Sequence, residues 1–338
     1  MYKIKQIPED FIVEEIPNIN LSKGGDYSYF FIEKKNWNTQ DVIRELARRL
    51  HVKENIFNIA GIKDKNAITR QVVSAYKMPQ QVIAKIKIKD VKINFIGRGN
   101  DRIKLGQIIK NNFTITVRNL DSKEHNKIDF IENYFDEQRF GGTNQLIGSA
   151  LVKKDFPEAC SLLGLNVEKN DYIGAIRNNV NRKMLVFYVN AYQSLLFNKA
   201  VSGYIKLKSA DFLDVKSENT NFTFTNSAIE NIKVPIIGFL SVIRNKEIKK
   251  IYTHILAKEG IKKEDFLFPM MPELSSEGNE RDLIVKVNVS ITFENDEINK
   301  NKLKAILSFS LDKGAYATIV IKKMFCNNQP IANDSQKA

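Results

Sequence analysis

One carboxylate, Asp64, lies between two lysines in the segment GIKDKNAITRQ, which covers residues 61–71. The mostly apolar residues 56–60 precede this segment, so we expect Asp64 where buried structure meets a loop. Adjacent cations favour the ionised form of a carboxylate, and an ionised carboxylate that is held in place can act as a nucleophile or a base. Charged turns are also common on protein surfaces, where their charges are merely solvated. The segment alone is therefore compatible with a catalytic loop and with an ordinary surface turn.

Residues that form metal sites or disulfides are few and far apart in this sequence. There are two cysteines, Cys160 and Cys326, and three histidines, His51, His125 and His254. They form neither a disulfide framework nor a zinc-ligand pattern. The sequence also has no Walker loop, no G-x-G-x-x-G segment and no nucleophile elbow. We therefore expect no metal and no small-molecule cofactor.

The charge of the chain is strongly positive, with a net charge of +13 and a pI near 9.4. Residues 84–110 hold eight Lys or Arg against two Asp, and residues 244–263 hold seven against two Glu. Lysine alternates with isoleucine over residues 85–89, which predicts a basic face opposite a buried one. A polyanion such as nucleic acid is the simplest partner for this charge, and an anionic membrane surface or plain solvation are the alternatives.

Length and hydrophobicity limit the protein class. The 338 residues exceed what one hydrophobic core usually supports, so we expect two domains. Hydrophobic content is 43%, no apolar run approaches membrane-spanning length, and the first residues do not resemble a signal peptide. With so few cysteines, a reduced, cytoplasmic location is the expectation.

Periodicity predicts a β-rich start and a β-rich end around a helical middle. Residues 141–281 show mainly helical patterns, whereas residues 283–293 alternate apolar and polar side chains without a break. The economical interpretation is an α+β domain built from both chain ends, with a second domain inserted. The predicted strands cover residues 27–33, 91–95, 113–117, 283–293, 307–311 and 317–321, and helices are predicted at residues 39–50 and 127–135.

Six segments of the chain form a set with a fixed order. They are KQIPEDFIVEE at 5–15, GIKDKNAITRQVVS at 61–74, GQIIKNNFTITVR at 106–118, NYFDEQRFG at 133–141, NAYQSLLFN at 190–198 and LDKGAYATIVIK at 311–322. In this order they resemble the TruD family of tRNA pseudouridine synthases. The similarity runs from about residue 4 to about residue 325, and its order makes it far more specific than any single motif.

The resemblance implies a fold and a division into domains. It implies a catalytic pseudouridine synthase domain with a mixed or antiparallel sheet, formed by residues 1–140 and 282–326. Residues 141–281 would form a helix-rich TruD-type insert, and residues 327–338 a polar, disordered tail.

The resemblance also implies an activity, the isomerisation of a specific uridine in tRNA to pseudouridine. The family's position would be uridine 13, and Asp64 occupies the place of its aspartate nucleophile. The implied partner is tRNA, without membrane or cofactor, and a monomer is compatible with the sequence. The sequence is compatible with three chemical routes for the aspartate: attack at C1′, formation of a glycal-like intermediate, or attack at C6 of uracil.

The residues that would hold the flipped base also follow from the resemblance. Phe11, Asn111, Phe113 and Tyr316 match the family's substrate-binding positions. Aromatic rings and an amide suit a flipped uracil, which is recognised by stacking and by hydrogen bonds to its edges. Packing in the core is the commoner fate of a phenylalanine on a strand, so each ring also has that alternative.

Five further residues have supporting roles by resemblance. Lys5 would pair with Asp64 or contact phosphate, and Lys63 flanks the carboxylate. Gln138 and Arg139 would hold the domain junction or touch RNA. Lys322 stands where the family tends to have arginine, and it lacks arginine's bidentate geometry.

A second departure from the family pattern is Asp136, which stands where glycine is usual. A non-catalytic RNA-binding protein or RNA folding helper on the same scaffold is the alternative function. Asp64 argues against it, because a carboxylate near RNA phosphates repels them.

Overall fold

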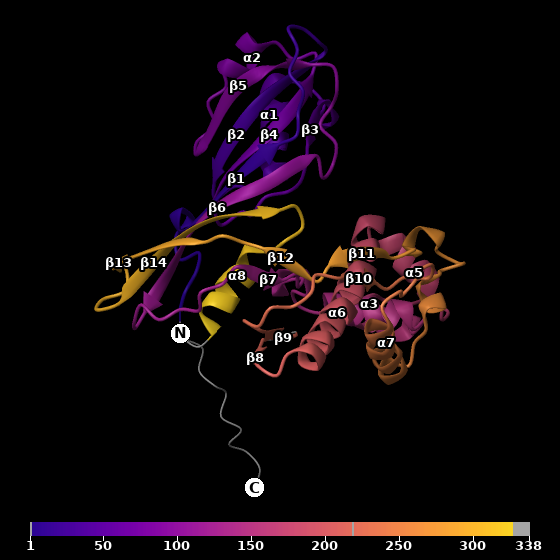
Figure 1. The fold of residues 1–338 in the computed structure, drawn as a ribbon. Coiled ribbons are helices and arrows are strands. Elements are labelled where there is room, and N and C mark those ends of the chain that lie inside the picture. Colours follow the sequence, from indigo (N-terminus) through magenta and orange to yellow (C-terminus); the bar gives the residue numbers. More distant parts are fainter. Residues whose placement is uncertain (1, 218–219, 327–338) are drawn as a thin grey trace. The chain divides into compact units, whose positions relative to one another are not determined.

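The computed structural model describes residues 2–217 and 220–326, which form two compact units (Figure 1). Of the described residues, the first unit takes residues 2–129, 287–317 and 324–326, and the second takes residues 130–217, 220–286 and 318–323. Both ends of the sequence therefore contribute to the first unit. The sequence-based division placed the boundaries at residues 140/141 and 281/282, and the tail predicted at residues 327–338 lies outside the described residues.

The first unit is built on an eight-stranded sheet with the order β13-β14-β6-β1-β4-β2-β5, and β3 pairs with β4. Strands β1 and β4 run parallel, while the other neighbouring strands run antiparallel. Because β14 pairs with β6, the two chain ends share one mixed sheet, as predicted. The elements are β1 (Phe11–Pro17), β2 (Tyr27–Lys35), α1 (Thr39–Leu50), β3 (Phe57–Ile59), β4 (Ile68–Tyr76), α2 (Gln80–Ala84), β5 (Val91–Gly99), β6 (Ile108–Leu120), β13 (Ser290–Asn295) and β14 (Leu303–Asp312).

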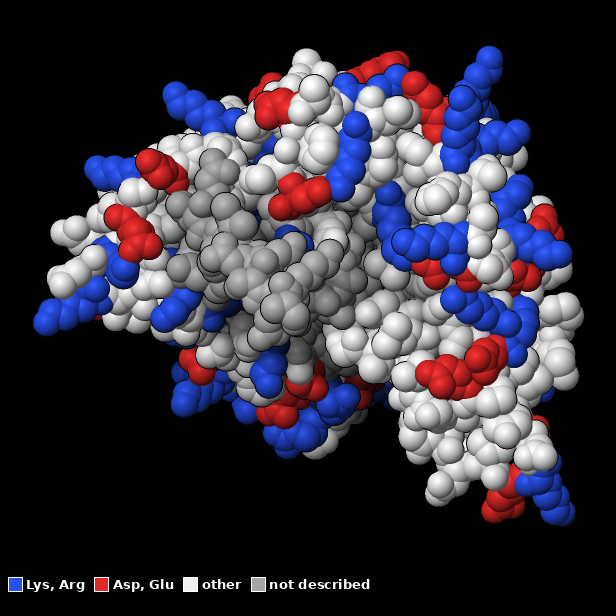
Figure 2. Space-filling model, turned by 90° about the horizontal axis from the view of Figure 1, so that it is seen from below, with Lys and Arg blue, Asp and Glu red and all other residues white. Residues whose placement is uncertain are grey.

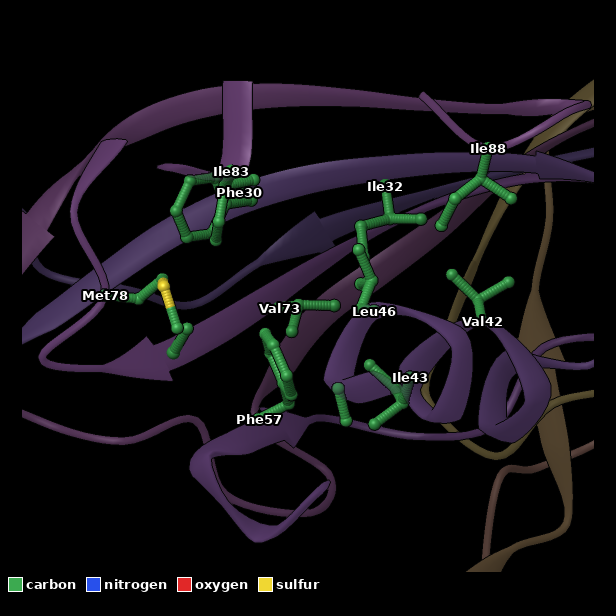
Figure 3. Packing of buried hydrophobic residues seen from close by; sticks show 12 residues of the cluster. Phe30, Ile32, Val42, Ile43, Leu46, Phe57, Val73, Met78, Ile83 and Ile88 are labelled. Atoms are coloured by element: carbon green, nitrogen blue, oxygen red, sulfur yellow. The ribbon is translucent and has the colours of Figure 1, made fainter. Parts of the chain in front are cut away.

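Helix α1 packs its apolar side against the sheet (Figure 3). Val42, Ile43 and Leu46 recur at helical spacing and are all buried. They belong to one cluster with Phe30 and Ile32, which alternate along β2. Burying such a side chain contributes about 1.5–3 kcal/mol, so the predicted helix at residues 39–50 is stabilised mainly by this contact.

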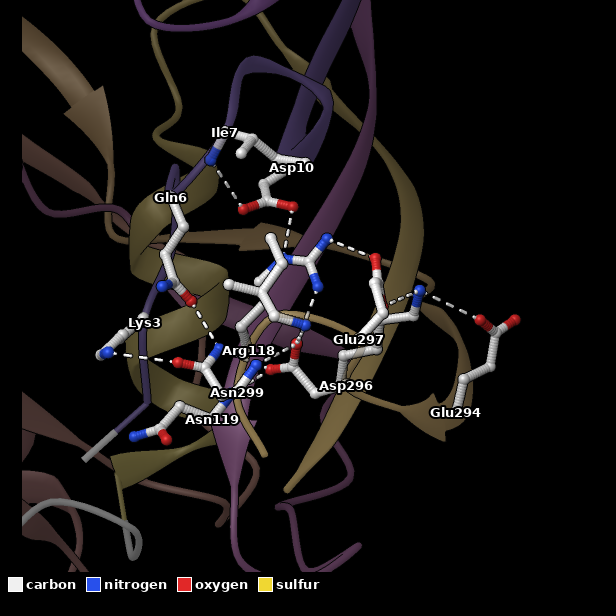
Figure 4. Close-up of polar contacts among 12 residues, drawn as sticks. Lys3, Gln6, Ile7, Asp10, Arg118, Asn119, Glu294, Asp296, Glu297 and Asn299 are labelled. Atoms are coloured by element: carbon white, nitrogen blue, oxygen red, sulfur yellow. Dashed lines mark hydrogen bonds and ion pairs between the residues drawn. The ribbon is translucent and has the colours of Figure 1, made fainter. Parts of the chain in front are cut away.

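A buried ion cluster joins β6 to the start of β1 (Figure 4). Arg118 is 3% exposed and donates from Nε to Asp10 at 2.7 Å, from Nη1 to Asp296 at 2.9 Å and from Nη2 to Glu297 at 3.0 Å. Asp10 ends the 3-10 turn Pro8–Asp10, directly before Phe11. The cluster therefore fixes where β1 begins.

The second unit is mainly helical around α6, which is 27 residues long and packs against α3 and α7. The predicted helical middle is confirmed, and the segment 190–198 lies within α6. Short strands were not predicted there. The elements are β7 (Phe130–Glu132), α3 (Asn144–Val152), α4 (Phe156–Leu163), α5 (Tyr172–Asn179), α6 (Arg182–Lys208), β8 (Leu213–Lys216), β9 (Asn221–Phe224), β10 (Lys233–Ile236), α7 (Lys246–Glu259), β11 (Asn279–Asp282), β12 (Ile284–Lys286) and residues 318–323 of α8 (Ala317–Met324).

Three predicted elements near the unit boundaries are wrong. The single strand at residues 283–293 is two strands, because β12 pairs with β7 whereas β13 pairs with β14. The strand at residues 317–321 is helix α8, and the helix at residues 127–135 contains strand β7. All three residues of β7 are buried, so periodicity could not distinguish a helix from a strand there.

Candidate active site

Asp64 lies in the irregular loop between β3 and β4, at the point where the sequence predicted a junction of buried structure and loop. Its side chain is 26% exposed, and its Oδ2 lies 3.2 Å from Nζ of Lys5, which is 23% exposed. Lys5 adopts the left-handed backbone region with φ of 57°, which is uncommon for a residue with a Cβ. Of the two roles open to Lys5, the structure shows the ion pair with Asp64.

Lys5 also connects Asp64 to the aromatic residues. Its Nζ lies 4.1 Å from the ring centre of Phe11, within the range of a cation–π interaction. The Phe11 and Phe113 ring centres are 6.3 Å apart in an edge-to-face arrangement, and Phe113 stacks on Phe309 at 5.5 Å. Phe11 is 3% and Phe113 9% exposed, so both rings also belong to the core. The structure thus brings Asp64, Lys5, Phe11 and Phe113 into one chain of contacts.

Asn111 is linked to the same loop by a second lysine. Nζ of Lys63 donates to Oδ1 of Asn111 at 2.6 Å and pairs with Oε2 of Glu15 at 3.0 Å. Glu15 is 1% exposed and lies opposite Asn111 in the β1–β6 register. The sequence analysis missed Glu15, although alternation from Phe11 places it on the buried face of β1.

The backbone of the loop is anchored from three secondary-structure elements. Gln71 on β4 donates to the carbonyl of Gly61 at 3.0 Å. Thr39, at the start of α1, accepts from the backbone N–H of Lys63 at 3.0 Å and donates to Gln71 at 3.0 Å. Lys34 on β2 donates to the carbonyl of Asp64 at 2.7 Å. Thr39 was expected only as the first residue of the helix predicted at residues 39–50, and Lys34 and Gln71 were not predicted as site residues.

The remaining predicted residues lie elsewhere in the chain. Tyr316 is half-buried in the first unit, directly before α8. Gln138 and Arg139 belong to the second unit, where Gln138 is exposed. Arg139 lies over the ring of Phe187, with its guanidinium carbon 5.1 Å from the ring centre, and its Nε donates to Ser194 at 3.4 Å.

The two departures from the family pattern contact each other in the second unit. Nζ of Lys322 lies 2.7 Å from Asp136 and 2.8 Å from Glu137. Asp136 also accepts a hydrogen bond from Thr318. Asp136 and Lys322, the two residues predicted to depart from the family pattern, therefore form an ion pair with each other.

The segment of residues 85–89 exposes its lysines, as predicted. Lys85, Lys87 and Lys89 are exposed, while Ile86 is half-buried and Ile88 is buried. On the face drawn in Figure 2, basic side chains are interspersed with acidic ones.

Two further observations concern metals and membranes. Across residues 2–217 and 220–326, no group of three or more His, Cys, Asp and Glu side chains could hold a metal ion. No helix in that part of the chain combines the length and apolarity needed to cross a bilayer.

Comparisons with known proteins agree along the whole chain. The family model described as "tRNA pseudouridine synthase D (TruD)" matches residues 2–166 and 160–324. The tRNA pseudouridine synthase D of Syntrophotalea carbinolica is 29% identical over 95% of each chain, and that of Aquifex aeolicus is 26% identical over 96% of this chain and 98% of its own.

A solved structure matches the fold. The crystal structure of the putative tRNA pseudouridine synthase D from Methanosarcina mazei superimposes with a TM-score of 0.72 at 24% identity. The match covers 95% of this chain and 92% of that one. The arrangement of a mixed sheet with a helical second unit is thus seen in a crystallised protein.

Proposed function

This chain belongs to the tRNA pseudouridine synthase D (TruD) family, and from that premise we propose that it converts one uridine of tRNA, uridine 13, to pseudouridine with Asp64 as the nucleophile. The observation that carries the proposal is the state of Asp64. Its side chain is 26% exposed and therefore reachable, while Lys5 holds it at 3.2 Å. A protein that only bound RNA would gain nothing from fixing a carboxylate near phosphates.

The proposed reaction conserves every atom and needs no co-reactant. The bond from N1 of uracil to C1′ breaks, the base turns, and a bond from C5 to C1′ forms. C5 loses its proton and N1 gains one. Asp64 attacks C1′ or assists departure of the base toward a glycal-like intermediate, with attack at C6 as the third route. Asp64 is also the base that accepts the C5 proton.

The proposed base site is formed by Phe11, Asn111, Phe113 and Tyr316. The contact chain from Asp64 through Lys5 to Phe11 and Phe113 supports it. The Asn111 oxygen accepts from Lys63, so the amide N–H group would be the donor to a uracil carbonyl oxygen. We assign supporting roles to Lys5 and Lys63 near the carboxylate, and to Gln138, Arg139 and Lys322 in the second unit.

We further propose that residues 1–140 and 282–326 carry the chemistry and that residues 141–281 form an insert that helps to bind tRNA. This assignment is supported by Asp64, Asn111 and Phe113, which all belong to the first unit. Lys5 and Phe11 connect Asp64 to Phe113, and Asn111 accepts a hydrogen bond from Lys63, next to Asp64. The excess of Lys and Arg in residues 244–263 supports RNA binding by the insert.

Mapping pseudouridine in tRNA transcripts after incubation with the full-length protein tests the activity. Asp64→Asn keeps the size of the side chain and removes the charge that the reaction requires. We expect it to retain tRNA binding and to convert uridine at less than about one per cent of the wild-type rate.

The matched control is Asp41→Asn, which changes a half-exposed aspartate on α1 and should act like wild type. Conversion by Asp64→Asn above that level would remove Asp64 from its role. Binding of tRNA without any conversion by the wild-type protein would instead favour the non-catalytic RNA-binding function.

A further inference from the structure

Lys34 is a buried lysine whose acceptors are backbone carbonyl groups. It is 1% exposed on β2, in phase with the buried Phe30 and Ile32. Its Nζ donates to the carbonyl oxygen of Trp37 at 2.7 Å, of Asp64 at 2.7 Å and of Lys63 at 3.5 Å. A lysine buried to this extent is rare unless it is paired, because burial removes the hydration of the ammonium.

The number of donors matches the number of acceptors. A protonated lysine has three N–H donors and no acceptor, and here three carbonyl oxygens surround it. One carbonyl precedes α1 and the other two belong to the loop that carries Asp64. The ammonium therefore joins β2, the start of α1 and the Asp64 loop at a single atom.

Lys34 supplies what the other anchors of the loop do not. Thr39 binds the N–H of Lys63, Gln71 binds the carbonyl of Gly61, and Lys5 binds the Asp64 side chain. Lys34 holds the backbone of Asp64 itself. The direction of the Asp64 side chain depends on that backbone.

We propose that Lys34 is a positioning residue, whose protonated ammonium holds the peptide groups of Lys63 and Asp64 so that the carboxylate is aimed at the substrate. This inference rests on the proposed role of Asp64. Lys34 does not touch the substrate in this scheme, and it acts through the loop.

The ionisation of Lys34 gives this role a dependence on pH. Burial lowers the pKa of Lys34, the Asp64 carboxylate opposes the shift and the Lys63 ammonium adds to it, and together they give a pKa of about 8. Below about pH 8 the ammonium makes all three bonds. Above it, the neutral amine has two N–H donors and a lone pair that repels a carbonyl oxygen, so the loop loses an anchor.

Rising pH has opposite effects on the stability of the protein and on the positioning of the loop. The folded-state pKa of about 8 lies below the value of 10.5 for an unperturbed lysine. The charged, buried form thus lowers the free energy of unfolding at neutral pH, and this penalty disappears as pH rises from about 8 toward 10.5. Lys34 therefore improves the position of the loop at a cost in stability.

The test is the single-turnover rate of pseudouridine formation from about pH 6 to about pH 10, a range that spans the titration of Lys34. The wild-type rate should fall as pH rises through about 8. Lys34→Met should be at least about tenfold slower at neutral pH, because a small misplacement of a catalytic group is costly, and should lack the fall near pH 8. Its tRNA affinity should stay within about twofold of wild type, since Lys34 does not reach the RNA.

The neighbouring lysine is the matched control. Lys35 is on the opposite face of β2, half-exposed and paired with Glu9. Lys35→Met should keep the wild-type rate and the wild-type pH profile. Lys34→Gln, which retains two N–H donors, should be slower than wild type and faster than Lys34→Met.

Each outcome decides the inference. A Lys34→Met protein with the wild-type rate, or with the same fall in rate near pH 8, overturns it. If Lys34→Met does not fold by circular dichroism, Lys34→Gln decides in the same assay. A wild-type protein without activity would contradict the proposed function, but it would not contradict the role of Lys34 in holding the loop. In that case, hydrogen exchange of the backbone around Asp64 in wild type and Lys34→Met would test the contacts between Lys34 and the loop.

Discussion

Two ionic clusters are attached to the same short segment, residues 5–11, and they differ in the charge that is in excess. In the first, the guanidinium of Arg118 is bound by three carboxylates, Asp10, Asp296 and Glu297. In the second, ammonium groups outnumber carboxylates. Its members are Lys5, Lys34, Lys63, Asp64 and Glu15.

Two of the three carboxylates of the Arg118 cluster, Asp10 and Asp296, are buried and bound by protein donors, whereas Glu297 is exposed. Although burial raises the pKa of Asp296, hydrogen bonds from the backbone N–H groups of Asn119, Ile298 and Asn299 hold that pKa well below its usual range. Asp10 is fully buried against Arg118. Such carboxylates have no remaining face for a ligand, so this cluster is structural.

The second cluster leaves its central carboxylate accessible. Asp64 and Lys5 are each about a quarter exposed, at 26% and 23%. The comparison teaches that the balance and exposure of charges, and not their number, separate a structural cluster from a candidate for catalysis.

Removing the arginine gives the largest expected effect on stability. Arg118→Met leaves Asp10 and Asp296, both fully buried, without their partner. Loss of one partner of a buried ion pair typically costs about 3–5 kcal/mol. Urea unfolding followed by the fluorescence of Trp37, the only tryptophan of the sequence, reports on the first unit directly.

The exposed arginine of α1 is the control for this measurement. Arg44 is 62% exposed and pairs with Asp41, so Arg44→Met should cost less than about 1 kcal/mol. Equal losses for the two variants would contradict the structural role of the Arg118 cluster.

Removing Lys5 should affect the rate more than the stability. Lys5→Met frees the Asp64 carboxylate from its 3.2 Å partner and removes the cation from the Phe11 ring. We expect a decrease of about tenfold to a hundredfold in the single-turnover rate, because the carboxylate is less well placed.

Lys3→Met is the matched control, since Lys3 is exposed and donates to Asn299 beside the Arg118 cluster. It should retain the wild-type rate. If Lys5→Met is as fast as Lys3→Met but less stable, Lys5 has a structural role like that of the Arg118 cluster. The proposed difference between the two clusters would then be wrong.

Local patterns predicted the parts of the fold that have one periodicity and one partner. The helix at residues 39–50 has its apolar positions on one face, and the strand at residues 27–33 lies within β2. The prediction of one strand at residues 283–293 was wrong because apolar and polar side chains keep alternating while the chain changes its partner strand between β12 and β13. The prediction of a strand at residues 317–321 was wrong because consecutive side chains are buried in α8. There, tertiary packing overrides the β propensity of isoleucine and valine.

The candidate site was predictable where side chains stand in a motif, and not where they act through the backbone. Asp64, Asn111 and Phe113 came from the family resemblance. Lys34 was not predicted because it is the same residue type as its neighbour Lys35. The two lysines differ only in the face of β2 to which their side chains point. Alternation from Phe30 would have indicated a lysine on a buried face.

The smallest expected effect concerns the salt dependence of tRNA binding, and it separates lysines with protein acceptors from lysines that face solvent. Lys5 is bound within the protein, whereas Lys85, Lys87 and Lys89 are exposed. Only exposed cations can release counterions from phosphates. Each phosphate contact that is lost lowers the slope of log affinity against log salt by about 0.7–0.9.

The triple variant Lys85→Gln, Lys87→Gln, Lys89→Gln should therefore reduce that slope by up to about 2–3 if all three lysines meet phosphates. Lys5→Met should leave the slope unchanged, although it slows the reaction. Filter binding or fluorescence anisotropy over a range of salt concentrations measures both. An unchanged slope in the triple variant would mean that residues 84–110 are an ordinary solvated face. A reduced slope in Lys5→Met would mean that Lys5 leaves Asp64 to bind RNA. The cationic cluster would then serve binding as well as catalysis.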